Sequence, residues 1–241
     1  MEGALPVLAV VVVVVTAGAV VVSAHFRKER VVELRSWARA HAWTYDEHHP
    51  APLGDTALPR PLGGRSPRFH HVLTGRHRAH EVVFFEHTPR PTAPVARGET
   101  RHTYRIVAVR IPGVGSDLEI RRRDDASTAV PTETAFDRAF QVSGADGFAR
   151  AALDRETVAW LLSDPRSRSF PVRFSGDHVL TWAVMRLDPD RALTAADYLI
   201  DLIARIPAQA WRHDDALRAG GTSPRSPVRT LQSGLPQRSK E

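Results

Sequence analysis

Histidine is the residue type in this chain with the most potential for chemistry. The sequence holds 12 histidines among 241 residues, and most of them gather in one third of the chain. Neutral imidazole is a common ligand of zinc and copper, so a metal site is the first hypothesis that this cluster suggests. The clustered histidines are His48, His49, His70, His71, His77, His80, His87 and His102.

The spacing of these histidines matches no metal-binding motif. The chain has no cysteine, no His-x-His sequence and no helical pair of histidines four residues apart with a carboxylate. His80-Glu81 begins like the helical zinc-protease motif, but Phe84 stands where the second histidine belongs, and the segment has the character of a strand. In a regular strand His70 and His71 point to opposite faces. We therefore predict surface or strand-end histidines, no metal ligands and no cofactor.

Other familiar signatures of catalysis are missing from the sequence. Gly113-Val114-Gly115 is a lone Gly-x-Gly without the third glycine or the lysine of a phosphate-binding loop. No Gly-x-Ser-x-Gly, no Ser-x-x-Lys and no cysteine supplies a nucleophile. We predict no catalytic residue. An enzyme of unrecognised type, metal-dependent through the histidine-rich strands, stays open as the alternative function.

The basic charge of the chain does not indicate a nucleic-acid partner. The net charge is +6 and the pI about 10.6, but nearly all of the positive charge is arginine, with lysine only at Lys28 and Lys240. This bias, together with abundant Ala, Val and Pro, is typical of GC-rich genomes such as those of actinobacteria. Arg121-Arg122-Arg123 is a local basic cluster, and neither an aromatic platform nor a recognition helix accompanies it.

An uncharged apolar run from residue 4 to residue 24 organises the whole chain. An α-helix needs about 20 apolar residues to cross roughly 30 Å of hydrocarbon, and lipid forces a single spanning segment to be helical. The run is too long for the core of a signal peptide, and the acidic Glu2 precedes it in place of a basic residue. We predict an uncleaved single-pass transmembrane helix over residues 4–24 in the bacterial plasma membrane.

Basic residues beside the run predict its orientation. Arg27, Lys28 and Arg30 follow the run, and no Lys or Arg precedes it. The positive-inside rule therefore puts the N-terminus outside and the C-terminal bulk in the cytoplasm. The same three residues are predicted to lie at the membrane interface, where each gains about 1 kcal/mol from anionic lipids. The lipid bilayer is thus the first predicted partner.

Three further segments follow the predicted anchor. Residues 26–42 have apolar residues at helical spacing and are predicted to form a juxtamembrane helix. Residues 43–211 are predicted to form a cytosolic α+β domain on an antiparallel sheet, because hairpin-like strands and helices show no βαβ alternation. One sheet of about seven strands and two smaller sheets joined near residue 130 both fit this pattern. Residues 212–241 are rich in Pro, Ser, Arg, Gln and Gly and are predicted to be disordered.

Glycines and capping residues predict where the elements of the domain begin and end. Asp146 and Asp154 are predicted to cap two consecutive short helices, and Thr194 with Asp197 is predicted to form the capping box of the last helix. Turns are predicted at three glycine-containing sites, each of which would divide the surrounding segment into two strands: residues 75–77, 112–115 and 175–177.

The stretch from Glu133 to Val142, with Phe148-Ala149-Arg150, Trp160-Leu161-Leu162 and Leu180-Thr181-Trp182 after it, is similar to a segment of uncharacterised membrane-anchored proteins of actinobacteria. The similarity covers residues 132–186. The layout of anchor, amphipathic helix and this block also resembles that family. The resemblance implies a domain of unknown function behind a membrane anchor, and it implies no catalytic residue.

Together these features predict a tethered, non-catalytic interaction or scaffold domain that binds a protein partner or the membrane surface. A histidine-rich surface beside a basic juxtamembrane segment also suggests a contact with anionic lipids. Such a contact would strengthen at low pH, because histidine gains its charge near pH 6.5.

Overall fold

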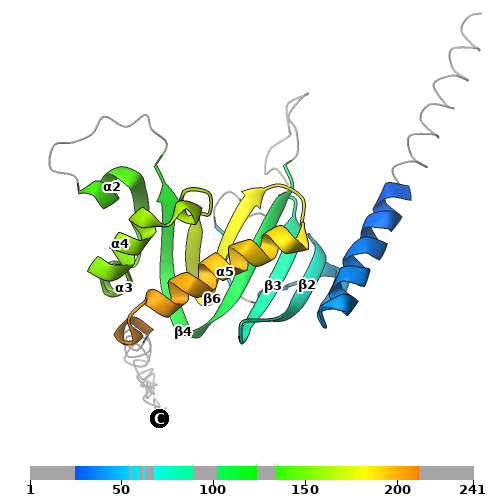
Figure 1. Cartoon of the computed structure of the whole chain (residues 1–241), viewed down its shortest axis with the longest axis horizontal. Coiled ribbons are helices and arrows are strands. Elements are labelled where there is room, and N and C mark those ends of the chain that lie inside the picture. The colour runs from blue at the N-terminus through cyan, green and yellow to red at the C-terminus, as the bar shows by residue number, and fades with distance from the viewer. Residues whose placement is uncertain are drawn as a thin grey trace, which may run out of the picture.

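The computed structural model describes residues 25–54, 56–59, 62, 68–89, 102–123 and 134–211. In this part of the chain, one antiparallel sheet of six strands carries helices on one face and at its ends (Figure 1). The predicted α+β class is confirmed, and of the two sheet arrangements the single sheet forms. None of the helices in these ranges is long and apolar enough to cross a bilayer. The predicted anchor, 4–24, and the predicted disordered tail, 212–241, lie outside the described residues.

The sheet is built from antiparallel neighbours in the order β1-β2-β3-β4-β5, and β6 pairs with the other edge of β4. Its strands are β1 (Thr44–His49), β2 (Phe69–His77), β3 (His80–His87), β4 (Tyr104–Arg122), β5 (Phe140–Gly144) and β6 (Val172–Val184). The helices include residues 25–40, α2 (Ala135–Ala139), α3 (Asp146–Ala152), α4 (Arg155–Ser163), the 3₁₀ helix η2 (Pro165–Arg168) and α5 (Pro189–Arg205), and residues 208–211 form one further helical turn. Asp154 caps α4 as predicted, whereas α3 begins at Asp146 without a side-chain cap.

Strands β4 and β6 are each continuous, although the sequence predicted a turn within both. β4 has 19 residues and β6 has 13, and the two pair along most of their length. The register shifts on both sides of Gly115, which faces Gly176 across the ladder. Glycines that interrupt a strand pattern accommodate an irregularity here, where the pairing is disturbed but the chain does not reverse. The predicted turns at 112–115 and 175–177 are therefore wrong.

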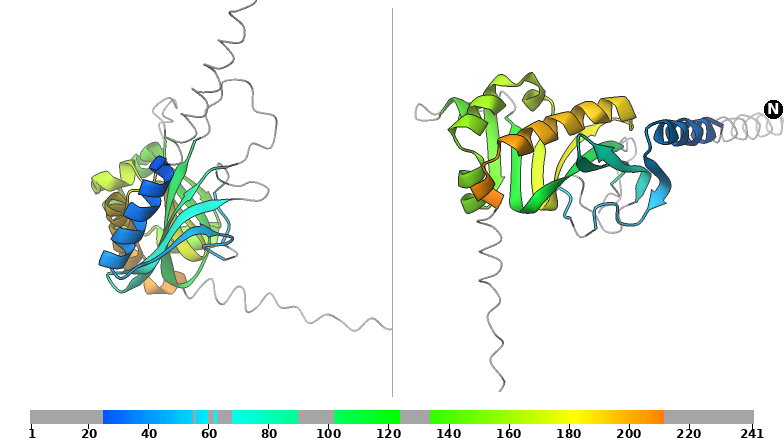
Figure 2. Two further views of the ribbon diagram at one scale, coloured as in Figure 1. Left: turned by 90° about the vertical axis from the view of Figure 1, so that its right-hand side faces the viewer. Right: turned by 60° about the horizontal axis from the view of Figure 1, so that its bottom comes forward.

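Two apolar clusters cover the two faces of the sheet. The larger cluster joins helix 25–40, α3, α4 and α5 to one face, and α5 crosses that face obliquely in Figure 1. Figure 2 shows helix 25–40 on the same side of the sheet as α5. The smaller cluster, which includes Leu53, Leu62 and Phe85, lies on the opposite face. Burial on both faces explains why Val82-Val83-Phe84-Phe85 is apolar at four successive positions.

Helix 25–40 is part of the domain core. Leu34 and Ala38 are buried against the sheet, and Trp37 Nε1 donates to Asp190 Oδ1 of α5 at 3.0 Å. Just beyond the helix, Trp43 stacks on Phe84 of β3 with ring centroids 4.7 Å apart. The helix is thus attached both to the sheet and to α5.

The β2–β3 hairpin turns at Arg78 and Ala79, which have φ of 47° and 69°. Positive φ at both central residues is the signature of a two-residue type I′ turn. The predicted turn at 75–77 is therefore wrong by a few residues. Gly75 has a packing role instead, since a Cβ at that position would lie 2.3 Å from the nearest ring atom of Trp43.

Helix α5 starts more than a turn before the predicted capping box. Asp188 is its N-cap and accepts hydrogen bonds from two backbone N–H groups, and Pro189 occupies the first turn. The predicted capping box of Thr194 and Asp197 is wrong, because both residues lie inside the helix. The Asp197 carboxylate instead contacts the tip of the β2–β3 hairpin, where His77 Nε2 is 2.9 Å away.

Candidate functional site

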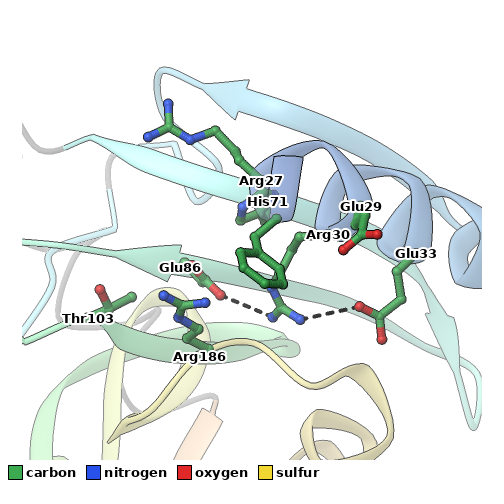
Figure 3. A pocket seen from close by; sticks show the side chains of 9 residues that line it. Arg27, Glu29, Arg30, Glu33, His71, Glu86, Thr103 and Arg186 are labelled. Carbon is green, nitrogen blue, oxygen red and sulfur yellow. Dashed lines mark hydrogen bonds and ion pairs between the residues drawn. The ribbon is translucent and has the colours of Figure 1, made fainter. Parts of the chain in front are cut away.

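A cleft of about 610 Å³ opens between the first turns of helix 25–40 and one end of the sheet. Helix residues form one wall, and β2, β3 and the segments just before β4 and just after β6 form the other (Figure 3). Charged and polar side chains dominate the lining, which consists of Phe26, Arg27, Glu29, Arg30, Glu33, His71, Glu86, Thr103 and Arg186. Such a lining suits a hydrated, charged ligand more than an apolar one.

Arg30 and Glu86 join the two walls of the cleft. Arg30 Nη2 lies 3.3 Å from Glu86 Oε1 and also donates to the carbonyl oxygen of Leu187. The same Glu86 oxygen accepts the backbone N–H of Leu187 at 2.7 Å. Glu86 is 8% exposed, and a carboxylate so deeply placed would be costly without these donors. The three groups fix the first turns of the helix to the segment that precedes α5.

An irregular stretch of β2 puts two histidines on the cleft side of the sheet. His71 has a φ of +52°, and the register with β3 shifts between His70 and Leu73, so His71 is the extra residue of a bulge. Its ring lines the cleft with Nδ1 2.8 Å from the hydroxyl oxygen of Tyr45. His70 is opposite Glu86 in the register and therefore points to the same face. The expectation of opposite faces is wrong, because side-chain alternation fails at a bulge.

Burial keeps the ring groups beside the cleft uncharged at neutral pH. It lowers the pKa of His71, an effect that Glu86 opposes and Arg30 reinforces. Burial also lowers the pKa of His70, with a further contribution from the neighbouring His48, and it raises the pKa of Tyr45 to about 12. The two histidines therefore gain positive charge only below the usual pKa of histidine, near 6.5.

The carboxylates of the cleft already have basic partners, whereas two of its arginines have none among the described residues. Glu86 and Glu33 both contact Arg30, the latter at 3.7 Å, and Glu29 Oε1 lies 3.1 Å from His25 Nε2. Within the described ranges, no hydrogen bond or ion pair engages the two remaining cations of the lining, Arg27 and Arg186. The cleft can thus supply positive charge to an anionic ligand.

The predicted membrane-interface residues lie on or beside the helix wall of this cleft. Arg27 and Lys28 are exposed, while Arg30 is directed into the domain toward Glu86. Their contact with lipid headgroups stays a prediction.

The histidine cluster divides between the two ends of the sheet. His77 and His80 lie at the tip of the β2–β3 hairpin, far from the cleft. The remaining members, at the cleft end, are His48, His49, His70, His71, His87 and His102. In the part of the chain that the structure describes, no three His, Asp or Glu side chains come together as a metal site.

The sheet wall of the cleft was not predicted from the sequence; it includes Glu86, Thr103 and Arg186. Glu86 carried a usable signal, since it is a single carboxylate directly after four apolar residues of a central strand. Such a carboxylate needs a donor when it is buried. Nothing in the sequence distinguishes Thr103 and Arg186 as site residues, because polar residues are common at the ends of strands.

Comparison with known proteins gives one structural similarity. No protein-family model matches the chain, and no curated protein matches it in sequence. Among solved structures, the chain is similar to the crystal structure of the mycobacterial trehalose monomycolate transport factor A, TtfA. The similarity covers 72% of this chain and 94% of that chain, with 17% sequence identity and a TM-score of 0.47. A likeness of this degree concerns the fold alone.

Proposed function

We propose that this chain is a membrane-tethered, non-catalytic binding domain that stands at the cytoplasmic surface of a bacterial plasma membrane. One observation carries the proposal: helix 25–40, which follows the apolar run 4–24 directly, is built into the domain core. Its buried Leu34 and Ala38, and the contacts of Arg30 and Trp37, tie it to the sheet and to α5. A flexible linker would let the domain move away from its anchor, whereas this helix holds it in place.

Rigid attachment gives the cleft a defined position. With residues 4–24 across the bilayer and the helix continuing from them, Arg27 lies only about 4.5 Å beyond residue 24 along the axis. That distance is within the headgroup layer of a bilayer. The cleft, whose lining begins at Phe26, then opens at the membrane surface, where it can meet lipid headgroups or a membrane-bound protein partner.

Thiol labelling tests this topology cleanly, because the chain has no cysteine of its own. The substitutions are Gly3→Cys before the run and Ser36→Cys on the exposed side of helix 25–40. In bacterial spheroplasts, a membrane-impermeant maleimide should label Gly3→Cys at once and Ser36→Cys only after permeabilisation. The chain should also resist alkaline extraction. The reverse labelling pattern, or release into the soluble fraction, would refute the proposed tether.

A further inference from the structure

Besides Arg30, which pairs with Glu86, the cleft beside helix 25–40 holds two cationic side chains on different walls. Arg27 comes from the helix, and Arg186 comes from the segment that follows β6. In Figure 3 Arg27 and Arg186 extend from opposite walls on the same side of the view, with Arg186 beside Thr103, whereas Glu29 and Glu33 lie on the other side. The cleft is therefore polarised along its length, with a basic end and an acidic end.

The basic end has charge available for a ligand. Arg27 and Arg186 are exposed, and no other described residue pairs with either of them. The guanidinium group presents a planar fork of N–H donors that matches the oxygens of a phosphate. Two such groups from separate elements can approach one phosphate from different sides.

An aromatic side chain accompanies these cations. Phe26 is 64% exposed and lines the same cleft. A large exposed apolar ring is unfavourable in water, but phenylalanine is among the residues that helices at the membrane surface bury at the boundary between headgroups and acyl chains. Cations and an exposed aromatic residue at one opening favour a lipid over a small soluble anion.

We propose that the cleft binds the phosphate of an anionic phospholipid headgroup. Arg27 and Arg186 are the phosphate ligands, and Phe26 lies in the interfacial layer beside them. This inference rests on the proposed function, because the tether is what brings lipid to the cleft. Headgroup binding then holds the sheet end of the domain against the bilayer.

The test uses the full chain in lipid nanodiscs, either with phosphatidylglycerol mixed into phosphatidylcholine or with phosphatidylcholine alone. Val184→Cys, at an exposed position near the cleft end of β6, carries a donor dye, and the headgroups carry the acceptor. Energy transfer should be higher in the anionic discs. Ala79→Cys, at the hairpin tip, should show weaker transfer in both kinds of disc.

Arginine variants identify the ligands. Arg27→Gln and Arg186→Gln should each lower the ratio of domains with the sheet end against the bilayer to domains tilted away from it roughly fivefold in anionic discs, and the double variant should remove the lipid dependence. Arg39→Gln is the matched control, because Arg39 is exposed on the same helix but three turns away from Arg27. It should behave as the unmodified chain does, and all variants should unfold at the same temperature.

Three outcomes would overturn the inference. Transfer that is equal in anionic and neutral discs, or unchanged by both arginine variants, excludes headgroup binding by this cleft. Inorganic phosphate that binds the chain equally tightly in neutral and anionic discs, while energy transfer does not differ between them, would identify a soluble phosphate as the ligand instead. A chain that fails to enter the discs refutes the tether itself, and the thiol labelling described above recognises that failure separately.

Discussion

Gly75 is the position where a single methyl group should do most damage to the attachment of helix 25–40. A Cβ at this position would lie 2.3, 2.5 and 2.6 Å from three ring atoms of Trp43. Carbon atoms in contact stay about 3.5 to 4.0 Å apart, so the Gly75→Ala substitution forces the ring to retreat by more than about 1 Å. Neighbouring rings oppose that retreat, because Trp43 stacks on Phe84 at 4.7 Å and meets Trp37 edge-on at 5.6 Å.

Overpacking of this kind costs about 2 to 3 kcal/mol. In a domain of this size each kcal/mol lowers Tm by roughly 2 to 4 °C, so Gly75→Ala should lower Tm by about 4 to 12 °C. Circular dichroism of the full chain in detergent during heating measures this. Gly113→Ala is the matched control: its Cβ would meet Trp211 at 3.4 Å, an ordinary contact, and its effect should stay within about 0.5 kcal/mol.

A double-mutant cycle decides whether the tryptophan ring is the cause. If the reasoning is right, Trp43→Leu removes the obstacle, and adding Gly75→Ala to it should then cost almost nothing further. A Gly75→Ala chain with the Tm of the unmodified protein would refute the packing argument. An equal cost of Gly75→Ala in both backgrounds would show that the glycine serves the strand backbone instead.

Three other predictions concern charge. Glu86→Ala should lower the free energy of unfolding by about 2 to 4 kcal/mol, measured by denaturant titration, because two donors lose a buried acceptor; a loss no larger than that of Glu86→Gln would contradict this. Arg166 lowers the pKa of Asp164, so the stability advantage over Asp164→Asn should be full above about pH 5, begin to fall near the ordinary carboxyl pKa of about 3.9, and vanish only below the still lower pKa of the folded state. Burial lowers the pKa of His70 and His71, so these histidines gain charge only as pH falls below about 6.5, and energy transfer in anionic discs should increase as pH is lowered through that range; transfer that stays constant between about pH 7.5 and about pH 4.5 would argue against a histidine contribution.

Features that depend on near neighbours in the sequence could be predicted, and features that depend on distant partners could not. The amphipathic spacing of Leu34 and Ala38 was enough to predict a packed helix after the apolar run 4–24, and Asp154 was enough to predict the start of α4. Gly115 and Gly176 look like turn residues for the same local reasons. They form an irregularity instead, because each faces the other across a long ladder, and no local pattern contains that information.

The cleft depends more than any other feature on contacts between residues that are far apart in the sequence. Its two walls meet where Arg30 contacts Leu187, 157 positions further along the chain. The bulge at His71 adds to the difficulty, since one extra residue moves a side chain to the other face of a strand. The residue types of the helix wall were visible in the sequence, and they led to the prediction of a membrane interface. The sheet wall follows only from the fold.

The two attachments of helix 25–40 should separate stability from lipid binding. Arg30 is held near one end by Glu86, and Trp43 is held just past the other end, which lies about 15 Å away along the helix axis. If Gly75→Ala displaces Trp43 by about 1 Å and the helix pivots at Arg30, then Arg27, about 4.5 Å beyond the pivot, moves by only about 0.3 Å. A shift so small leaves the cleft intact. Gly75→Ala should therefore unfold at a lower temperature and still respond to anionic lipid, whereas Arg27→Gln should do the opposite.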